Sequence, residues 1–265
     1  KKNEMAFIFS LNGETEELVK SAKNAQESGA CVVTCCCNNI ASILQYTDLS
    51  LITAKQSIGA ETAMVFTALQ KGEIVEKVKE LLVAPACLQK RIIDMIDYEI
   101  EKVKNKKDGY IGLKFNSLTD KTLIEKLIEA SQVGVKIELI IRGICCLKPG
   151  IAGITENIRV ISIVGRYLEH SRIYIFGQKD DEKIYISSAD LMTRNTLRRV
   201  EVAVPIYDED IKHRIRNMFD IMMRDDKKGK EQNSSGIYCE RLINTPKIDS
   251  QEYFYQEAYK KETNM

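Results

Sequence analysis

Several features are scarce in this sequence of 265 residues, and each one excludes a class of protein. The 39 basic and 38 acidic side chains leave a net charge of only +1, so nothing draws the whole chain toward nucleic acid or an anionic membrane. No stretch approaches the ~20 apolar residues that a membrane-spanning helix needs, and no charged-then-apolar signal segment opens the sequence. We therefore predict no nucleic-acid partner and no integral membrane segment. Any anion site must be built from local arginines and lysines.

Zinc-type spacing is missing as well, although the chain has eight cysteines. The run from Cys35 to Cys37 lacks the CxxC spacing of zinc sites, and no histidine lies near it. We predict no metal ligands in the chain and interpret the cysteines as reduced, buried, structural thiols, which suits a reducing cytosol. The predicted location is cytoplasmic, with association to a membrane surface left open.

The apolar pattern that is present predicts an α/β chain of two parts, with mixed and parallel sheets flanked by helices. Strands over 5–9 and 31–36 enclose a helix over 16–28 that Gly29 closes. Helices over 58–69 and 74–82 follow, and the break at 83–85 predicts a domain boundary. Residues 1–80 would form an incomplete or hybrid first domain, and residues 81–265 a complete second one.

The second part alternates between strand and helix patterns. Its clearest helix covers 88–104, with Ile92, Ile93, Ile96 and Ile100 on one stripe. A polar linker is predicted over 227–235. The other expected helices cover 120–133, 208–224 and 250–261, and the strands cover 110–115, 136–142, 159–164, 172–176, 183–188 and 200–206.

Two candidate site residues stand beside these strands. Arg142 follows the strand over 136–142, where parallel sheets bind ligands, and its guanidinium can donate two hydrogen bonds to one phosphate. His170 lies between Arg166 and Arg172, before the next strand. A His-x-Arg element followed by SSADLMTRN (187–195) resembles half of a phospholipase D-type site, where two histidines flank a phosphoryl group as nucleophile and general acid.

Plainer interpretations of these residues stay open. Arg142 could pair with a surface carboxylate, and His170 could be a satisfied structural residue. His213 lies in a basic helix and is interpreted as part of its solvated face. Three further arginines could extend a basic pocket or be ordinary surface charge, namely Arg194, Arg198 and Arg199.

Longer motifs carry a more specific resemblance. The segments YTDLSLIT (46–53), LVAP (82–85), YIGLKFNS (110–117), IRGICCLKPG (141–150), SIVGRYLEHSR (162–172) and DSQEYF (249–254) are similar to polyphosphate kinase. The resemblance implies a phospholipase D-like C-terminal domain that moves the terminal phosphate of ATP onto inorganic polyphosphate, with Mg²⁺, through a phosphohistidine. It implies that Tyr46 contacts the nucleotide, that Arg142 and Arg172 bind phosphate, and that His170 assists transfer without being phosphorylated.

The chain departs from that family near its beginning. The family's phosphorylated histidine precedes the segment of Tyr46, whereas this chain has no histidine before His170. The arginines that the family places near Mg²⁺ have no counterpart here either. Residues 8–33 instead resemble the phosphosugar-binding domain of sugar isomerases, in which a loop before a helix holds a sugar phosphate. That loop would consist of Ser10, Asn12, Gly13 and Thr15.

Three functional hypotheses follow from these patterns. The first is a phosphotransferase acting on ATP, ADP and polyphosphate, incomplete here because the phosphorylated histidine is missing. The second is a non-catalytic module that binds ATP or polyphosphate, and the third is a phosphosugar sensor. A truncated first domain would expose apolar surface, so we also predict a homo-oligomer.

Overall fold

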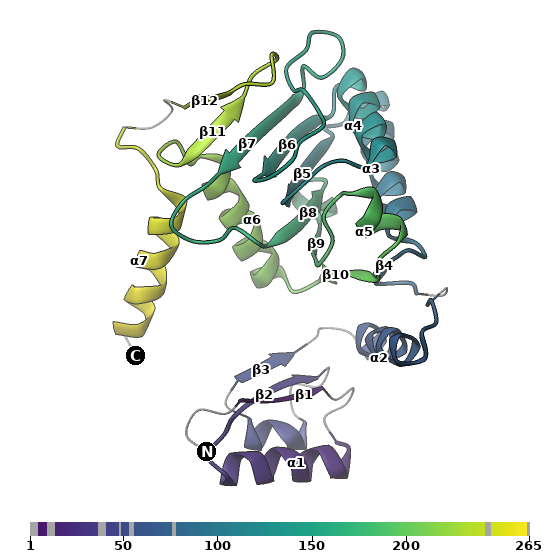
Figure 1. Ribbon diagram of the computed structural model, residues 1–265, viewed down its shortest axis with the longest axis vertical. Helices are drawn as coiled ribbons and strands as arrows, with labels where there is room; N and C mark the ends of the chain where they lie inside the picture. The colour runs from purple at the N-terminus through teal and green to yellow at the C-terminus, as the bar shows by residue number, and fades with distance from the viewer. Residues whose placement is uncertain are drawn as a thin grey trace. The chain divides into compact units, whose positions relative to one another are not determined.

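The chain folds into two compact units, Lys1–Leu81 and Leu82–Met265, each described here by itself (Figure 1). The computed structural model describes residues 5–9, 14–36, 41–47, 49–52, 56–75, 78–241 and 245–263. The predicted division placed the boundary after residue 80. Whether the first unit is incomplete or hybrid stays a prediction.

The first unit is a three-stranded parallel sheet with order β1-β2-β3. Its helices begin and end close to the predicted residues, and Gly29 follows α1 with φ +77°, a left-handed conformation that glycine adopts without strain. Ile8, Val32 and Ile43 lie in its small core. The elements are β1 (Met5–Phe9), α1 (Glu16–Glu27), β2 (Cys31–Cys36), η1 (Ser42–Tyr46), β3 (Leu49–Ile52) and α2 (Gln56–Lys71).

The predicted helix over 74–82 is wrong. Among its described residues none is helical, and Leu82 begins β4 (Leu82–Ala84). The carboxylate of Glu61, on α2, accepts the backbone N–H groups of Lys79, Glu80 and Leu81 at distances of 2.7–3.2 Å. These bonds hold the segment in a turn, because the same N–H groups would otherwise be available to a helix.

The second unit is built on a nine-stranded mixed sheet with order β12-β11-β7-β6-β5-β8-β9-β10-β4. The β7-β6-β5 strands are parallel, and the other neighbours are antiparallel. The predicted α/β class with helices flanking a mixed sheet is confirmed. The remaining strands are β5 (Tyr110–Phe115), β6 (Lys136–Ile141), β7 (Ile158–Ile163), β8 (Arg172–Phe176), β9 (Lys183–Ser187), β10 (Glu201–Ile206), β11 (Gly229–Gln232) and β12 (Tyr238–Glu240).

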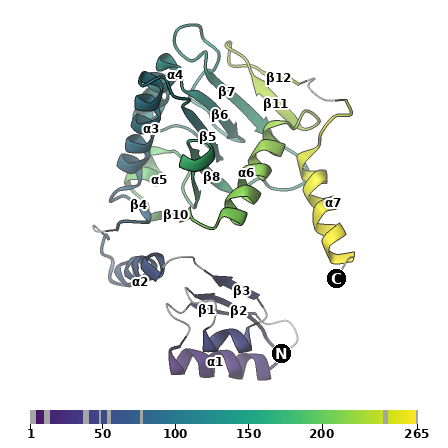
Figure 2. The same cartoon turned by 180° about the vertical axis from the view of Figure 1, so that it is seen from behind.

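Helices cover both faces of this sheet (Figures 1 and 2). On one face α3 (Leu88–Lys104) and α4 (Lys121–Val133) pack through a stripe that includes Ile92, Ile96 and Ile100. On the other face α6 (Glu209–Met223) contributes Phe219 and Met222 to a second core. Successive strand residues alternate between these two cores, as strand geometry requires. Two further helices are α5 (Thr193–Leu197) and α7 (Ser250–Thr263).

The predicted polar linker over 227–235 is also wrong, because β11 pairs with β7 there. Asp225 is fully buried, and its Oδ1 accepts the N–H groups of residues 227, 228 and 229 at 2.8–3.1 Å. Glu231 then pairs with Arg159 on β7 and with Arg241. Charged residues therefore build this strand through cross-strand partners that local sequence does not reveal.

The prediction of buried cysteines fails for the thiols that the structure describes. Cys146 and Cys239 are exposed, whereas Cys87 and Cys145 are half-buried, and none of these four forms a disulfide bond. The side chains of the first four cysteines lie outside the described residues. None of the helices in the described part of the chain is both long enough and apolar enough to cross a membrane.

Candidate functional site

The sheet of the second unit gathers four polar side chains at one edge. Asn116 follows β5 and Arg142 follows the parallel strand β6, so both lie at carboxyl ends of neighbouring strands. Strand β8 is antiparallel to β5, which brings His170 to the same edge just before β8 begins. Asp190 arrives after β9, which pairs Ser187 with the first residue of β8. The sheet register alone therefore assembles this set, which we call the site edge.

The amide of Asn116 joins the two residues that the sequence singled out. Its Oδ1 accepts a hydrogen bond from Nη2 of Arg142 at 2.6 Å. Its Nδ2 lies 3.3 Å from Nδ1 of His170. Arg142 and His170 thus face a common point instead of pointing apart. Arg142 forms no ion pair with any described residue, which leaves its remaining N–H groups available to an anion.

The carboxylate of Asp190 holds both Asn116 and Arg172 in place. Its Oδ1 accepts the backbone N–H of Asn116 at 2.8 Å and Nε–H of Arg172 at 3.1 Å. Its Oδ2 lies 3.4 Å from Nδ2 of Asn116 and 3.5 Å from Nη2 of Arg172. Arg172 also donates to the backbone carbonyl of His170 at 2.8 Å. Arg172 is therefore held by the protein itself, and its predicted role in phosphate binding stays a prediction.

A buried lysine supports the segment before His170. Lys114 is 2% exposed and donates to Oγ of Ser171 at 2.8 Å, and its Nζ lies 3.3 Å from the carboxylate of Glu169. Burial lowers the pKa of Lys114; Glu169 opposes this shift, and the positive charges of Arg142 and Arg172 add to it. Lys114 therefore ties Ser171 and Glu169, on either side of His170, to strand β5.

Helix α7 fixes the same segment from outside the sheet. Nε2 of Gln251 donates to the carbonyl of Tyr167 at 2.8 Å and to Glu169 at 2.7 Å. Its Oε1 accepts the backbone N–H of Tyr167 at 2.9 Å. A Cβ on Gly165 would collide with the amide of Gln251, so only glycine allows this approach. The residues before His170 are thus held in one conformation.

Backbone bonds lock the strand ends to one another. The N–H of Gly143 donates to the carbonyl of Asn116 at 2.7 Å, and the N–H of Leu118 donates to Ile144 at 2.8 Å. Thr119 and Asp120 both donate to the carbonyl of Leu191. The site edge is therefore pre-organised, which is what electrostatic stabilisation of a phosphate requires.

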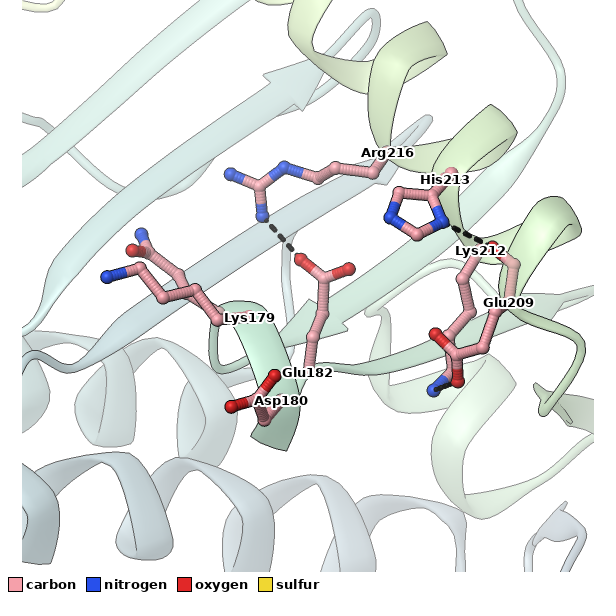
Figure 3. Close-up of a pocket in the computed structure, with 8 residues that line it drawn as sticks. Lys179, Asp180, Glu182, Glu209, Lys212, His213 and Arg216 are labelled. Carbon is pink, nitrogen blue, oxygen red and sulfur yellow. Dashed lines mark hydrogen bonds and ion pairs between the residues drawn. The ribbon is translucent and has the colours of Figure 1, made fainter.

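The opposite ends of the same strands form a pocket of about 570 Å³ (Figure 3). His213 lines it as an exposed residue of α6, and its Nδ1 lies 2.7 Å from the carbonyl of Glu209. Arg216 donates to Glu182 at 2.9 Å and to Asp220, and Lys212 pairs with Glu209. Lys212 and Arg216 are thus neutralised by neighbouring carboxylates.

The other predicted site residues lie in the first unit. Tyr46 ends η1, is half-buried and packs against the core of that unit. Thr15 is the exposed N-cap of α1 and makes no side-chain capping bond. Ser10, Asn12 and Gly13 lie outside the described residues. The nucleotide role of Tyr46 and the phosphosugar loop stay predictions.

Two residues of the site edge escaped the sequence interpretation, namely Asn116 and Asp190. Both lie inside motifs that were quoted, YIGLKFNS and SSADLMTRN, at the point where a strand ends. A rule that takes every polar residue directly after a strand would have found Asn116. The exposed basic residues Arg194, Arg198 and Arg199 form no ion pair with the described residues.

Comparisons with known proteins agree with this architecture. The family model described as polyphosphate kinase C-terminal domain 2 matches residues 81–251. The chain is 49% identical over 215 residues to polyphosphate kinase of Staphylococcus haemolyticus, a match that covers 81% of this chain and 30% of that protein. It is 48% identical over 223 residues to polyphosphate kinase of Bacillus cereus, covering 83% of this chain and 32% of the relative.

A crystal structure of polyphosphate kinase from Porphyromonas gingivalis superposes with a TM-score of 0.75 at 26% identity. The match covers 99% of this chain and 49% of that one. The chain therefore spans about 30% of the length of the curated relatives it matches. These matches show that the chain belongs to the polyphosphate kinase family, with residues 81–251, which contain the mixed sheet, as its C-terminal domain 2.

Proposed function

We propose that the site edge binds phosphate groups of ATP and of inorganic polyphosphate and takes part in phosphoryl transfer between them. The family relationship supplies the substrate class. One observation carries the proposal. Among the described residues, the Arg142 guanidinium has a hydrogen bond only to the neutral amide of Asn116. An arginine without a carboxylate partner, beside a histidine, suits an anion with several oxygens.

Fixed positive charge is the main contribution that this edge offers. Phosphoryl transfer requires positioning and neutralisation of the charge on the transferred group more than covalent chemistry. Arg142 would donate to phosphate oxygens, and His170 would donate a hydrogen bond beside it. Lys114 lies beneath this edge and would contribute at longer range.

The residues that the structure describes offer no ligand set for the proposed Mg²⁺. Among the described residues no cluster of three His, Cys, Asp or Glu side chains could hold a metal ion. The one carboxylate at the site edge, Asp190, is occupied by Arg172 and Asn116. Mg²⁺ is commonly bound through substrate phosphates, so we propose that it enters with the nucleotide.

A binding titration with a matched control tests the proposal. We expect Arg142→Gln to weaken the binding of ATP and polyphosphate about 10- to 100-fold, since a hydrogen bond to a charged group contributes roughly 1.5–3 kcal/mol. Lys179→Gln, which removes an exposed cation beside the opposite pocket, should bind like the wild type. Equal losses in both variants, or no loss in either, would contradict the proposal.

The transfer step is tested separately from binding. Wild-type chain is incubated with Mg²⁺ and ATP labelled at the γ-phosphate, and the label is followed into polyphosphate and into protein. Label in polyphosphate supports the phosphotransferase. Binding without any transfer would instead favour the non-catalytic binding module.

A further inference from the structure

The orientation of the Asn116 amide is fixed by chemistry at both of its ends. Arginine has no acceptor, so the atom 2.6 Å from Nη2 of Arg142 must be the oxygen of Asn116. The other end of the amide faces the carboxylate of Asp190 at 3.4 Å, and an ionised carboxylate only accepts. Two independent neighbours therefore place the NH₂ group of Asn116 toward Asp190 and His170.

This orientation decides which nitrogen of His170 carries the proton. The NH₂ group is only a donor, so Nδ1 of His170, 3.3 Å away, must accept with its lone pair. In the neutral ring the single proton then sits on Nε2, the nitrogen that Asn116 does not touch. Protonating Nδ1 as well would place two N–H groups against each other, so the cationic ring loses this bond.

We propose that Asn116 is a positioning residue that holds His170 as the neutral Nε2–H tautomer, so that the site edge offers a phosphate a hydrogen bond instead of a proton. The identity of the ligand rests on the proposed function, whereas the hydrogen bonds that orient Asn116 and His170 do not depend on it. Nε2–H has no lone pair and cannot attack phosphorus, and loss of its proton would leave an imidazolate. His170 in this state is therefore neither nucleophile nor general acid. It stabilises negative charge, as Arg142 does beside it.

The rest of the site edge is built to keep the amide in place. Asp190 holds both the backbone N–H and the side chain of Asn116, and it is itself held by Arg172. Gly143 lies so close to Asn116 that a Cβ on residue 143 would be 2.9 Å from the backbone carbonyl oxygen of Asn116. Rotating the amide by half a turn would break the bond to Arg142 and set an oxygen against Asp190.

The chain supplies an internal control, because it has only two histidines. Nδ1 of His213 lies 2.7 Å from a backbone carbonyl, which only accepts, so the neutral ring of His213 carries its proton on Nδ1. The two imidazoles are therefore expected as opposite tautomers. Long-range ¹H–¹⁵N correlation spectra distinguish them, since protonated and bare ring nitrogens give well-separated ¹⁵N signals.

The experiment uses the ¹⁵N-labelled full chain without nucleotide, at about pH 8.5, where ordinary histidines are neutral. His213→Gln assigns the two rings. We expect His170 to show a protonated Nε2 and His213 a protonated Nδ1. A dominant Nδ1–H signal for His170 in the wild type would overturn the inference, whatever the ligand of the site proves to be.

A variant tests whether residue 116 is the cause. Asn116→Asp replaces the donor by an acceptor of the same shape, so His170 should gain a proton on Nδ1 while His213 stays unchanged. An unaltered His170 signal in a folded Asn116→Asp chain would show that the amide does not control the ring. Should that variant fail to fold, the wild-type spectrum still decides the tautomer.

Discussion

The two ends of strands β5, β8 and β9 carry similar side chains in opposite arrangements. Each end has an arginine, a histidine and at least one carboxylate. At the opposite pocket the carboxylates of Glu182 and Asp220 hold Arg216. At the site edge a neutral amide contacts Arg142, and the only carboxylate is turned toward Arg172. The same residue types thus give a neutralised surface at one end and an available cation at the other.

The difference shows that residue type alone does not identify an anion site. What decides is whether each cation already has a carboxylate partner, because a paired arginine must give up that pair before it can bind phosphate. The two histidines differ as well: Nδ1 of His170 faces a donor, whereas Nδ1 of His213 faces an acceptor. Each prediction below changes one end and uses a second position as control.

The largest effect is expected from removing the anchor of the site edge. Asp190 is 7% exposed and is bonded to Arg172 and to the backbone of Asn116. Asp190→Ala removes the ion-pair partner of Arg172, whose side chain is 12% exposed, and the acceptor of the Asn116 backbone N–H. We expect the free energy of unfolding to fall by about 3–5 kcal/mol in urea denaturation.

Asp220→Ala at the opposite end is the matched control. Its carboxylate also pairs with an arginine, but 45% of its side chain is exposed. We expect a loss under about 1 kcal/mol there. Comparable losses in the two variants would remove the contrast between the ends of the strands.

An intermediate effect is expected from the outer support of the segment before His170. Gln251→Leu removes three hydrogen bonds to Tyr167 and Glu169, so the unfolding free energy should fall by about 1–2 kcal/mol. Amide hydrogen exchange over residues 165–170 should accelerate more than in the rest of the sheet. Gln256→Leu, on the same helix but bonded only to Glu252, should leave that exchange unchanged.

The smallest effect is a pH dependence with a defined sign. Burial lowers the pKa of Lys114 below its ordinary 10.5, so the folded chain releases this proton before the unfolded chain does. The free energy of unfolding should therefore rise with pH in the window just below 10.5. Subtracting the free energy of unfolding of Lys114→Met from that of the wild type isolates this contribution, and the difference should rise with pH across the window.

Lys126 gives the opposite sign and serves as the control. Its hydrogen bonds to Glu129 and Asp97 raise its pKa above 10.5, so its contribution is present below 10.5 and is lost as pH rises through the raised value. If the difference in unfolding free energy between the wild type and Lys114→Met fell with pH, as expected for Lys126, then Glu169 and not burial would dominate the pKa of Lys114.

Much of the fold could be predicted from periodicity. The helix over 88–104 matches α3 because an unbroken isoleucine stripe at helical spacing has one way to be buried. The central strands were found to within about one residue, since runs of β-branched residues bounded by polar ones leave little choice. These signals are local, and so they survive in the sequence.

Two errors in the predicted elements involve the same kind of interaction, a buried carboxylate that accepts several backbone N–H groups. Glu61 takes the N–H groups of the segment predicted as a helix, and Asp225 takes those of the segment predicted as a linker. Glu61 lies 18–20 residues before its donors, a spacing that no local pattern predicts, whereas Asp225 lies only two to four residues before its donors and forms a local turn.

By itself the sequence determined the family, the α/β class, the elements of the central sheet, and Arg142 and His170 as candidates. Only the tertiary structure decided that these two meet at Asn116, that Asp190 faces Arg172, and that Lys212 and Arg216 on α6 are already paired. The reason is that strand register brings together the residues of the site edge, which lie up to 74 positions apart in the chain, and hydrogen-bond direction exists only once they meet.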